Sequence, residues 1–145
     1  MTRRSTWLIV LAVTIALPLS LVSLSSCTKA SQTNQGDYYN AGAADFSVTG
    51  AQFDKYQLFR FDTSTSGHTL ALPSAADIVA NLSSPYAGEV LSFAVAADGT
   101  NLVTLIAGTN VTIKTGASAV LGNTTLTLYC ELDSIASGSE AVSIY

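Results

Sequence analysis

Short runs of alternating apolar and polar residues fill most of the chain, and turn-forming residues separate them. Alternation with a period of two is typical of strands that bury one face. Because no long helical pattern lies between the runs, a parallel α/β sheet is excluded. We therefore expect a mainly β fold, a single antiparallel β-sandwich or jelly-roll-like domain over residues 51–145. The runs are residues 56–61, 68–72, 91–97, 102–107, 111–114, 124–132 and 141–145.

Three of these runs support more detailed predictions. Phe59 and Phe61 have the same parity, so both are expected to face the core. In residues 124–132 the alternation is strict and places Cys130 on the apolar face, where it is predicted to be a small buried hydrophobe. Asp98 and Gly99 follow the apolar run 91–97, and this dipeptide predicts a hairpin turn.

One segment has a helical pattern instead. In residues 73–82, Ser74 stands in the N-cap position, Asp77 follows three residues later, and Ile78, Val79 and Leu82 share one apolar face. We expect one short helix here, lying across an open end of the sandwich.

The N-terminal residues 1–27 have the pattern of an export signal. Arg3 and Arg4 precede an apolar run, residues 7–22, which leads to the sequence Leu-Ser-Ser-Cys ending at Cys27. This ending looks like a bacterial lipobox and predicts lipidation of Cys27, with residues 1–26 removed. Two alternatives remain: a hydrophobic helix, residues 8–24, that stays as an uncleaved membrane anchor, and cleavage without lipid. All three place the rest of the chain outside a membrane.

Between this signal and the strands, residues 28–50 are rich in Ser, Gln, Asn, Gly and Ala. Tyr38 and Tyr39 form the only bulky pair, and no helical or strand period is present. The segment is predicted to be a flexible spacer.

Charge limits the partners of the protein. Six Lys and Arg against ten Asp and Glu give a formal net charge of −4. Removal of residues 1–26 takes away Arg3 and Arg4 and no acidic residue, so the charge becomes −6. Nucleic acid is therefore excluded as a partner, because binding phosphates requires clustered Lys and Arg.

The residues offer little for catalysis or cofactor binding. His68 is the only histidine and is expected at the surface of a turn, although a Ser–His–Asp arrangement with Ser64 or Ser66 and Asp62 can be imagined. No established catalytic or phosphate-binding motif occurs, and the acidic residues are spread singly. We predict no enzyme activity, no catalytic residue, no metal and no cofactor.

The C-terminal half resembles a small domain found in structural and fibre proteins of tailed phages and of some large DNA viruses. The resemblance is carried by residues 69–82 (TLALPSAADIVANL), 88–95 (GEVLSFAV), 107–113 (AGTNVTI), 124–128 (TTLTL) and 137–145 (SGSEAVSIY). It implies a β-rich, non-enzymatic module that often forms trimers on virion surfaces. The export segment departs from this pattern, because a capsid or fibre protein does not normally carry one.

Two functional hypotheses follow. The first is an exported, membrane-anchored structural or display module of a cell envelope or virus particle, acting through protein–protein assembly. It would form a homo-oligomer, preferably a trimer, in which Ile144 and Tyr145 of an exposed terminal strand lie at the interface. The alternative to that interface is that the strand pairs centrally and Tyr145 caps the core. The second hypothesis is a surface lipoprotein that binds a glycan, with Tyr86 of the loop 85–88 as the contact.

Overall fold

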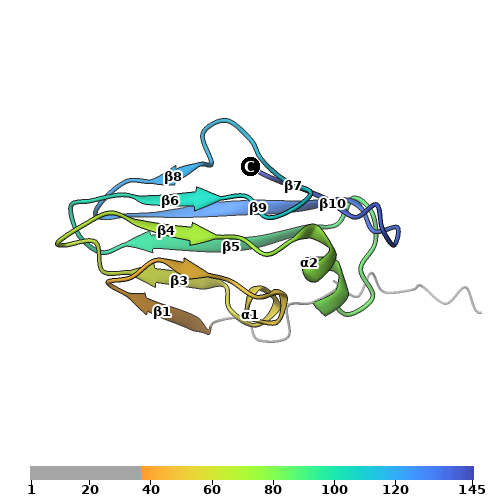
Figure 1. Cartoon of the computed structure of the whole chain (residues 1–145), viewed down its shortest axis with the longest axis horizontal. Helices are drawn as coiled ribbons and strands as arrows, with labels where there is room; N and C mark the ends of the chain where they lie inside the picture. Colours follow the sequence, from red (N-terminus) through yellow and green to blue (C-terminus); the bar gives the residue numbers. More distant parts are fainter. Residues whose placement is uncertain (1–36) are drawn as a thin grey trace, which may run out of the picture.

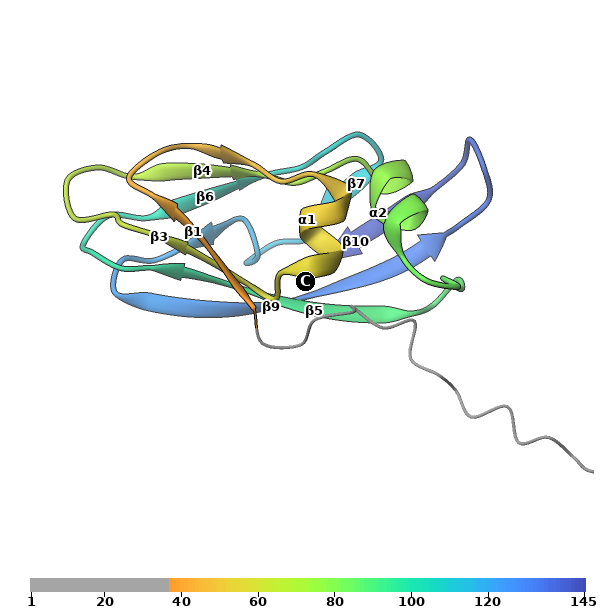
Figure 2. The ribbon, with the colours of Figure 1, turned by 90° about the horizontal axis from the view of Figure 1, so that it is seen from below.

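The computed structural model describes residues 37–145, which form two sheets and two short helices. The prediction of a mainly β fold is confirmed. In the larger sheet the strand order is β1 (Tyr38–Gly42), β3 (Leu58–Phe61), β5 (Val90–Ala97), β9 (Thr124–Ser134), β10 (Ala141–Ile144) and β7 (Val111–Ile113). In the smaller sheet the order is β2 (Phe46–Ser47), β4 (His68–Ala71), β6 (Val103–Ile106) and β8 (Ala119–Val120). The two layers are stacked, as Figure 2 shows.

The sheets are mixed, so the prediction of an antiparallel domain is wrong. Strands β1, β3 and β5 run parallel to one another, as do β2, β4 and β6. The reason is that the chain alternates between the layers: from β1 to β8, odd-numbered strands lie in the larger sheet and even-numbered strands in the smaller one. Each return to a sheet therefore involves two reversals of direction. For the same reason Asp98 and Gly99 connect β5 to β6 across the layers and do not form the predicted hairpin.

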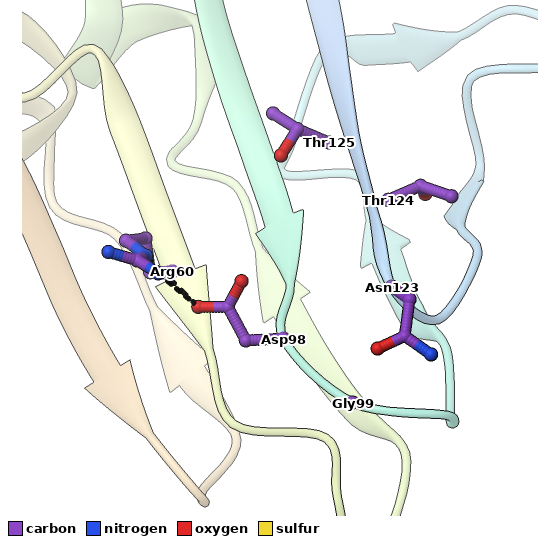
Figure 3. Close-up of a pocket in the computed structure, with 6 residues that line it drawn as sticks. All are labelled: Arg60, Asp98, Gly99, Asn123, Thr124 and Thr125. Atoms are coloured by element: carbon purple, nitrogen blue, oxygen red, sulfur yellow. Dashed lines mark hydrogen bonds and ion pairs between the residues drawn. The ribbon is translucent and has the colours of Figure 1, made fainter.

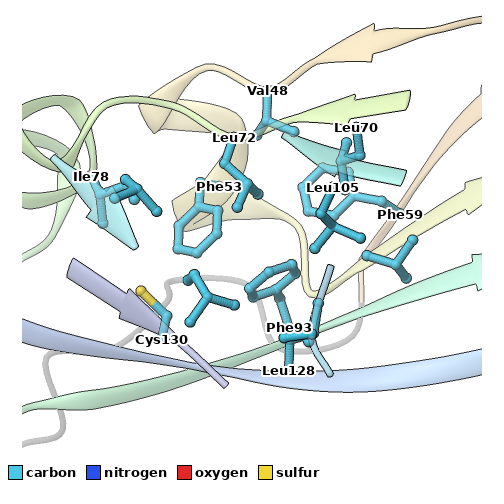
Figure 4. Packing of buried hydrophobic residues seen from close by; sticks show 14 of the residues in the cluster. Val48, Phe53, Phe59, Leu70, Leu72, Ile78, Phe93, Leu105, Leu128 and Cys130 are labelled. Atoms are coloured by element: carbon cyan, nitrogen blue, oxygen red, sulfur yellow. The ribbon is translucent and has the colours of Figure 1, made fainter. Parts of the chain in front are cut away.

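The core lies between the two layers and is filled by the inward residues of both sheets (Figure 4). Phe93 is 1% exposed and packs edge to face against Phe53 and Phe59, with ring centroids 5.1 and 6.4 Å apart. Phe59 and Phe61 are fully buried, and so is Cys130 between Leu128 and Leu132 on β9, as their parity predicts.

The two helices lie at the same end of the molecule (Figure 2). Helix α2 (Ala75–Asn81) is the predicted one, and its N-cap Ser74 accepts a hydrogen bond from the Asp77 amide. Helix α1 (Gly50–Lys55) was not expected, so the prediction of a single helix is wrong. A capping box between Thr49 and Gln52 begins α1. Gly50 lets the helices meet, because a Cβ there would collide with the carbonyl oxygen of Asp77.

The prediction of a flexible spacer over residues 28–50 is wrong for its second half, which supplies β1, β2 and the start of α1. Aromatic packing is the reason. Tyr39 stacks on Phe46 with centroids 4.4 Å apart, and both rings lie within 6.5 Å of Phe59. Strand β1 also pairs with β3 along its length. Residues 28–36 lie outside the described part of the chain.

The predicted export signal, Cys27 and the predicted hydrophobic helix also lie outside the described residues. Within residues 37–145, no helix is both long enough and apolar enough to cross a bilayer.

Candidate functional site

The outer side of the larger sheet carries an exposed apolar surface. Tyr145 follows β10 and lies opposite Tyr129 of β9, and the two residues exchange backbone hydrogen bonds of 2.9 and 3.2 Å. Tyr129 is 52% exposed, Tyr145 is 49% exposed, and Val90, one row away on β5, is 54% exposed. We call Val90, Tyr129 and Tyr145 the tyrosine face.

A hydrogen bond holds one ring of the tyrosine face in place. The Tyr145 hydroxyl donates to the Glu131 carboxylate at 2.7 Å. This bond raises the pKa of Tyr145 above its ordinary value, because it favours the protonated hydroxyl. The tyrosine face thus combines large apolar surface with a polar edge, a combination that is enriched where proteins meet partners.

The structure separates the two residues predicted at an interface. Strand β10 lies between β9 and β7, so it is not an edge strand, and the structure has the alternative arrangement in which it pairs centrally. Ile144 is 0% exposed, because it faces the core between the layers. It therefore has no surface to offer a partner, and its predicted interface role is wrong, whereas Tyr145 stays half exposed.

A second feature is a hollow of about 520 Å³ where β5 ends and β9 begins (Figure 3). We call it the polar hollow. Arg60 and Asp98 form an ion pair at its wall, with Nη2 2.8 Å and Nε 3.0 Å from the same carboxylate oxygen, Oδ2. The polar hollow is lined by Arg60, Asp98, Gly99, Asn123, Thr124 and Thr125.

The strand register explains why the surface is hollow here. Arg60 of β3, Ala96 of β5 and Thr125 of β9 lie side by side in one row on the outer face. Ala96 has the smallest side chain of the three and is only 4% exposed. The longer side chains of Arg60 and Thr125 project further from the sheet on either side of it, and this leaves a depression over Ala96.

The loops that close the polar hollow are tied together by backbone contacts. The backbone N–H of Asn123 donates to the Gly99 carbonyl oxygen at 2.6 Å. Asn123 has a φ of 57°, a left-handed conformation that asparagine tolerates better than most residues. Gly99 approaches Thr63 and Ser64 so closely that a Cβ would collide with their backbone. The walls are therefore held in position by the fold.

His68 is buried, with 8% of its surface exposed, and the prediction of a surface histidine is wrong. Its ring stacks on Phe61, and Nε2 lies 3.1 Å from the backbone oxygen of Asp62 and 3.5 Å from Ser66 Oγ. The Asp62 carboxylate instead accepts from Ser64, and these bonds lower the pKa of Asp62. His68 contacts the main chain of Asp62 and not its carboxylate, so the imagined arrangement with Asp62 is not formed. The carboxylate nearest to His68 is that of the exposed Asp45, whose Oδ1 lies 3.8 Å from Nδ1.

Cys130 lies in the core, and burial raises the pKa of its thiol to about 12, with smaller contributions from Asp133 and Glu89. A thiol with this pKa is a poor nucleophile at neutral pH.

Tyr86 is 46% exposed in the loop between α2 and β5. This loop precedes β5, whereas Asp98 follows it, so Tyr86 and the polar hollow lie at opposite ends of that strand. Sequence reasoning did not find the polar hollow. The only local pattern at this place is the Asp98-Gly99 dipeptide, which by itself predicts a hairpin turn and not a binding site.

Comparison with known proteins gives no match: no family model matches the sequence, and neither do curated proteins or solved structures. Among residues 37–145, His, Cys, Asp and Glu side chains form no group of three that could hold a metal ion.

Proposed function

We propose that this protein is a non-enzymatic, exported display module, anchored to a membrane by its N-terminal segment and acting through protein–protein assembly. Its setting is a cell envelope or a virus particle. The export pattern of residues 1–27 supports the anchor, with lipidated Cys27 or the apolar run as its means.

The course of the chain supports display. The described chain enters the fold at Asp37, whose carbonyl oxygen accepts from the Gln57 amide beside α1. Strands β1, β3 and β5 all run from this end towards the polar hollow. An anchor attached before Asp37 would therefore leave the far end of the sheet, with its loops, as the outermost part of the module.

The tyrosine face is the observation that carries the assembly proposal. Tyr129 and Tyr145 lie opposite each other, and Val90 lies one row away on the other side of β9. Each side chain is about half exposed, and together they offer a surface that a second copy would cover. A trimer is preferred, since the resemblance to viral structural domains implies one. In this proposal Tyr145 keeps its place in the interface and Tyr129 joins it, while Ile144 stays in the core.

The proposal that the protein is not an enzyme is supported by the surroundings of His68 and Cys130, two side chains of types that often act in catalysis. His68 is engaged with the Asp62 backbone and the Phe61 ring, and Cys130 is a buried thiol with a raised pKa. Both are accounted for by packing. The proposal also includes a relationship of this fold to the jelly-roll-like domains of viral structural proteins.

Light scattering of the extracted full-length protein tests assembly. We expect a trimer that dissociates in Tyr129→Ser, while the matched control Tyr86→Ser, which removes a tyrosine of similar exposure, stays assembled. A monomeric wild-type protein, or equal behaviour of the two variants, would refute assembly through this face. Mass spectrometry of the same material should show an acylated chain that starts at Cys27, and an intact Met1 would leave the uncleaved anchor as the means of attachment.

A glycan-binding surface lipoprotein is the alternative function, and the exposure of Tyr86 favours it. A glycan array on the same protein tests this, with loss of binding in Tyr86→Ala as the expected result. Retained binding in this variant excludes Tyr86 as the contact.

A further inference from the structure

The two charged side chains of the polar hollow, Arg60 and Asp98, form an ion pair with each other. Two of the five N–H donors of Arg60 are used by Asp98 Oδ2, at 2.8 and 3.0 Å, which leaves donors on Arg60 and the Oδ1 acceptor of Asp98. Because the pair is neutral as a whole, the polar hollow has no net charge with which to attract an ion. Its other polar lining residues are Asn123, Thr124 and Thr125.

Charge therefore excludes the two simplest ligand classes. An anion bound to the remaining Arg60 donors would lie beside the Asp98 carboxylate, which repels it, in a chain whose formal net charge is −4. A metal cation needs several oxygen ligands of negative or strongly polar character, and here a guanidinium lies against the only carboxylate. A neutral ligand rich in hydroxyl groups fits the remaining chemistry, because each hydroxyl both donates and accepts.

The donor and acceptor arrangement suits such a ligand. The Thr124 hydroxyl donates to the Leu121 carbonyl oxygen at 2.6 Å, and its side chain lies on the opposite face of β9 from Thr125, so the hydrogen-bonding groups of the hollow come from its other residues. Asn123 supplies an amide that both donates and accepts, and Thr125 supplies a second hydroxyl. Planar carboxylate, amide and guanidinium groups can each bond to two neighbouring hydroxyls of a sugar ring.

An aromatic ring flanks the same site. The Arg60 guanidinium lies 5.9 Å from the centroid of the Tyr38 ring, and Tyr38 is 57% exposed on the outer face. Tyr38 is not among the residues that line the hollow, and its contact with the guanidinium helps to hold Arg60 in place at the wall. The volume of about 520 Å³ lies within the range of small-molecule sites, and the fixed loops reduce the entropy lost on binding.

We propose that the polar hollow is a binding site for a neutral sugar, with Arg60, Asp98, Asn123 and Thr125 as its hydrogen-bonding residues. The site deepens the glycan-binding alternative and places it away from Tyr86. It rests neither on the tyrosine face nor on assembly, so either proposal can fail alone.

The test is saturation-transfer NMR on the full-length protein in a zwitterionic detergent, which carries no sugar headgroup. The probes are the methyl glycosides of glucose, galactose, mannose and N-acetylglucosamine at millimolar concentration, with sialic acid as an anionic comparison. Asn123→Gly removes the amide and keeps the left-handed backbone, and Thr125→Val removes a hydroxyl with little change of shape. Asn110→Gly is the matched control, because Asn110 has a φ of 58° and lies outside the polar hollow.

We expect at least one neutral glycoside to bind, with affinity reduced about tenfold or more in Asn123→Gly and Thr125→Val and unchanged in Asn110→Gly. Absence of binding by all four glycosides overturns the proposal. So does a preference for sialic acid, and so does equal binding by Asn123→Gly and Asn110→Gly. Light scattering on the same samples reports assembly separately.

Discussion

Cys130 should make the stability of the folded domain fall at alkaline pH. The thiol is fully buried, and burial raises its pKa from 9.0 to about 12. A raised folded-state pKa means that the folded domain holds the proton more tightly than the unfolded chain does. The contribution of the thiol is therefore complete below pH 9 and is lost as the pH rises towards 12.

The size of the effect follows from the two pKa values. At pH 10 the unfolded thiol is one unit above its pKa and is mostly ionised, while the folded thiol is still protonated. Ionisation then stabilises the unfolded chain by on the order of 1 kcal/mol relative to pH 7. Other groups that titrate over this range, such as Tyr145, contribute equally to a variant that lacks the thiol.

Urea denaturation of residues 28–145 and of the variant Cys130→Ala, at pH 7 and pH 10, isolates the thiol. The wild type should be the more stable at pH 7, because the substitution leaves a small cavity in the core. This advantage should shrink by on the order of 1 kcal/mol at pH 10. A difference between the two proteins that stays constant with pH would mean that the thiol is accessible to water, and the assigned burial would be wrong.

Two further substitutions test the packing of the domain. Phe93→Ala should lower the free energy of unfolding by about 3–5 kcal/mol, because it removes the ring that joins Phe53 to Phe59, and a loss below about 1 kcal/mol in urea denaturation would contradict that packing. His68→Ala should cost about 1–3 kcal/mol through the lost Asp62 contact and the lost stacking on Phe61, while the assembly state measured by light scattering stays unchanged.

The alternating pattern identified the strands that bury one complete face, and it missed elements that are short or stabilised by distant contacts. Strand β2 has two residues, too few for any period to appear. Strand β1 is ordered by aromatic contacts of Tyr39 with Phe46 and Phe59, which no local pattern records. Helix α1 was within reach, because Thr49 and Gln52 have the spacing of a capping box.

Strand direction and the polar hollow were beyond local reasoning for one shared reason. A period of two reports which face of a strand is buried, and says nothing about which strand lies beside it. The alternation of successive strands between the two layers makes β3 and β5 parallel neighbours and brings Arg60 next to Ala96, far along the chain. Asp98 and Asn123 meet Arg60 only through that same pairing. In this fold the connections across the core therefore determine both the mixed sheets and the surface on which a ligand would bind.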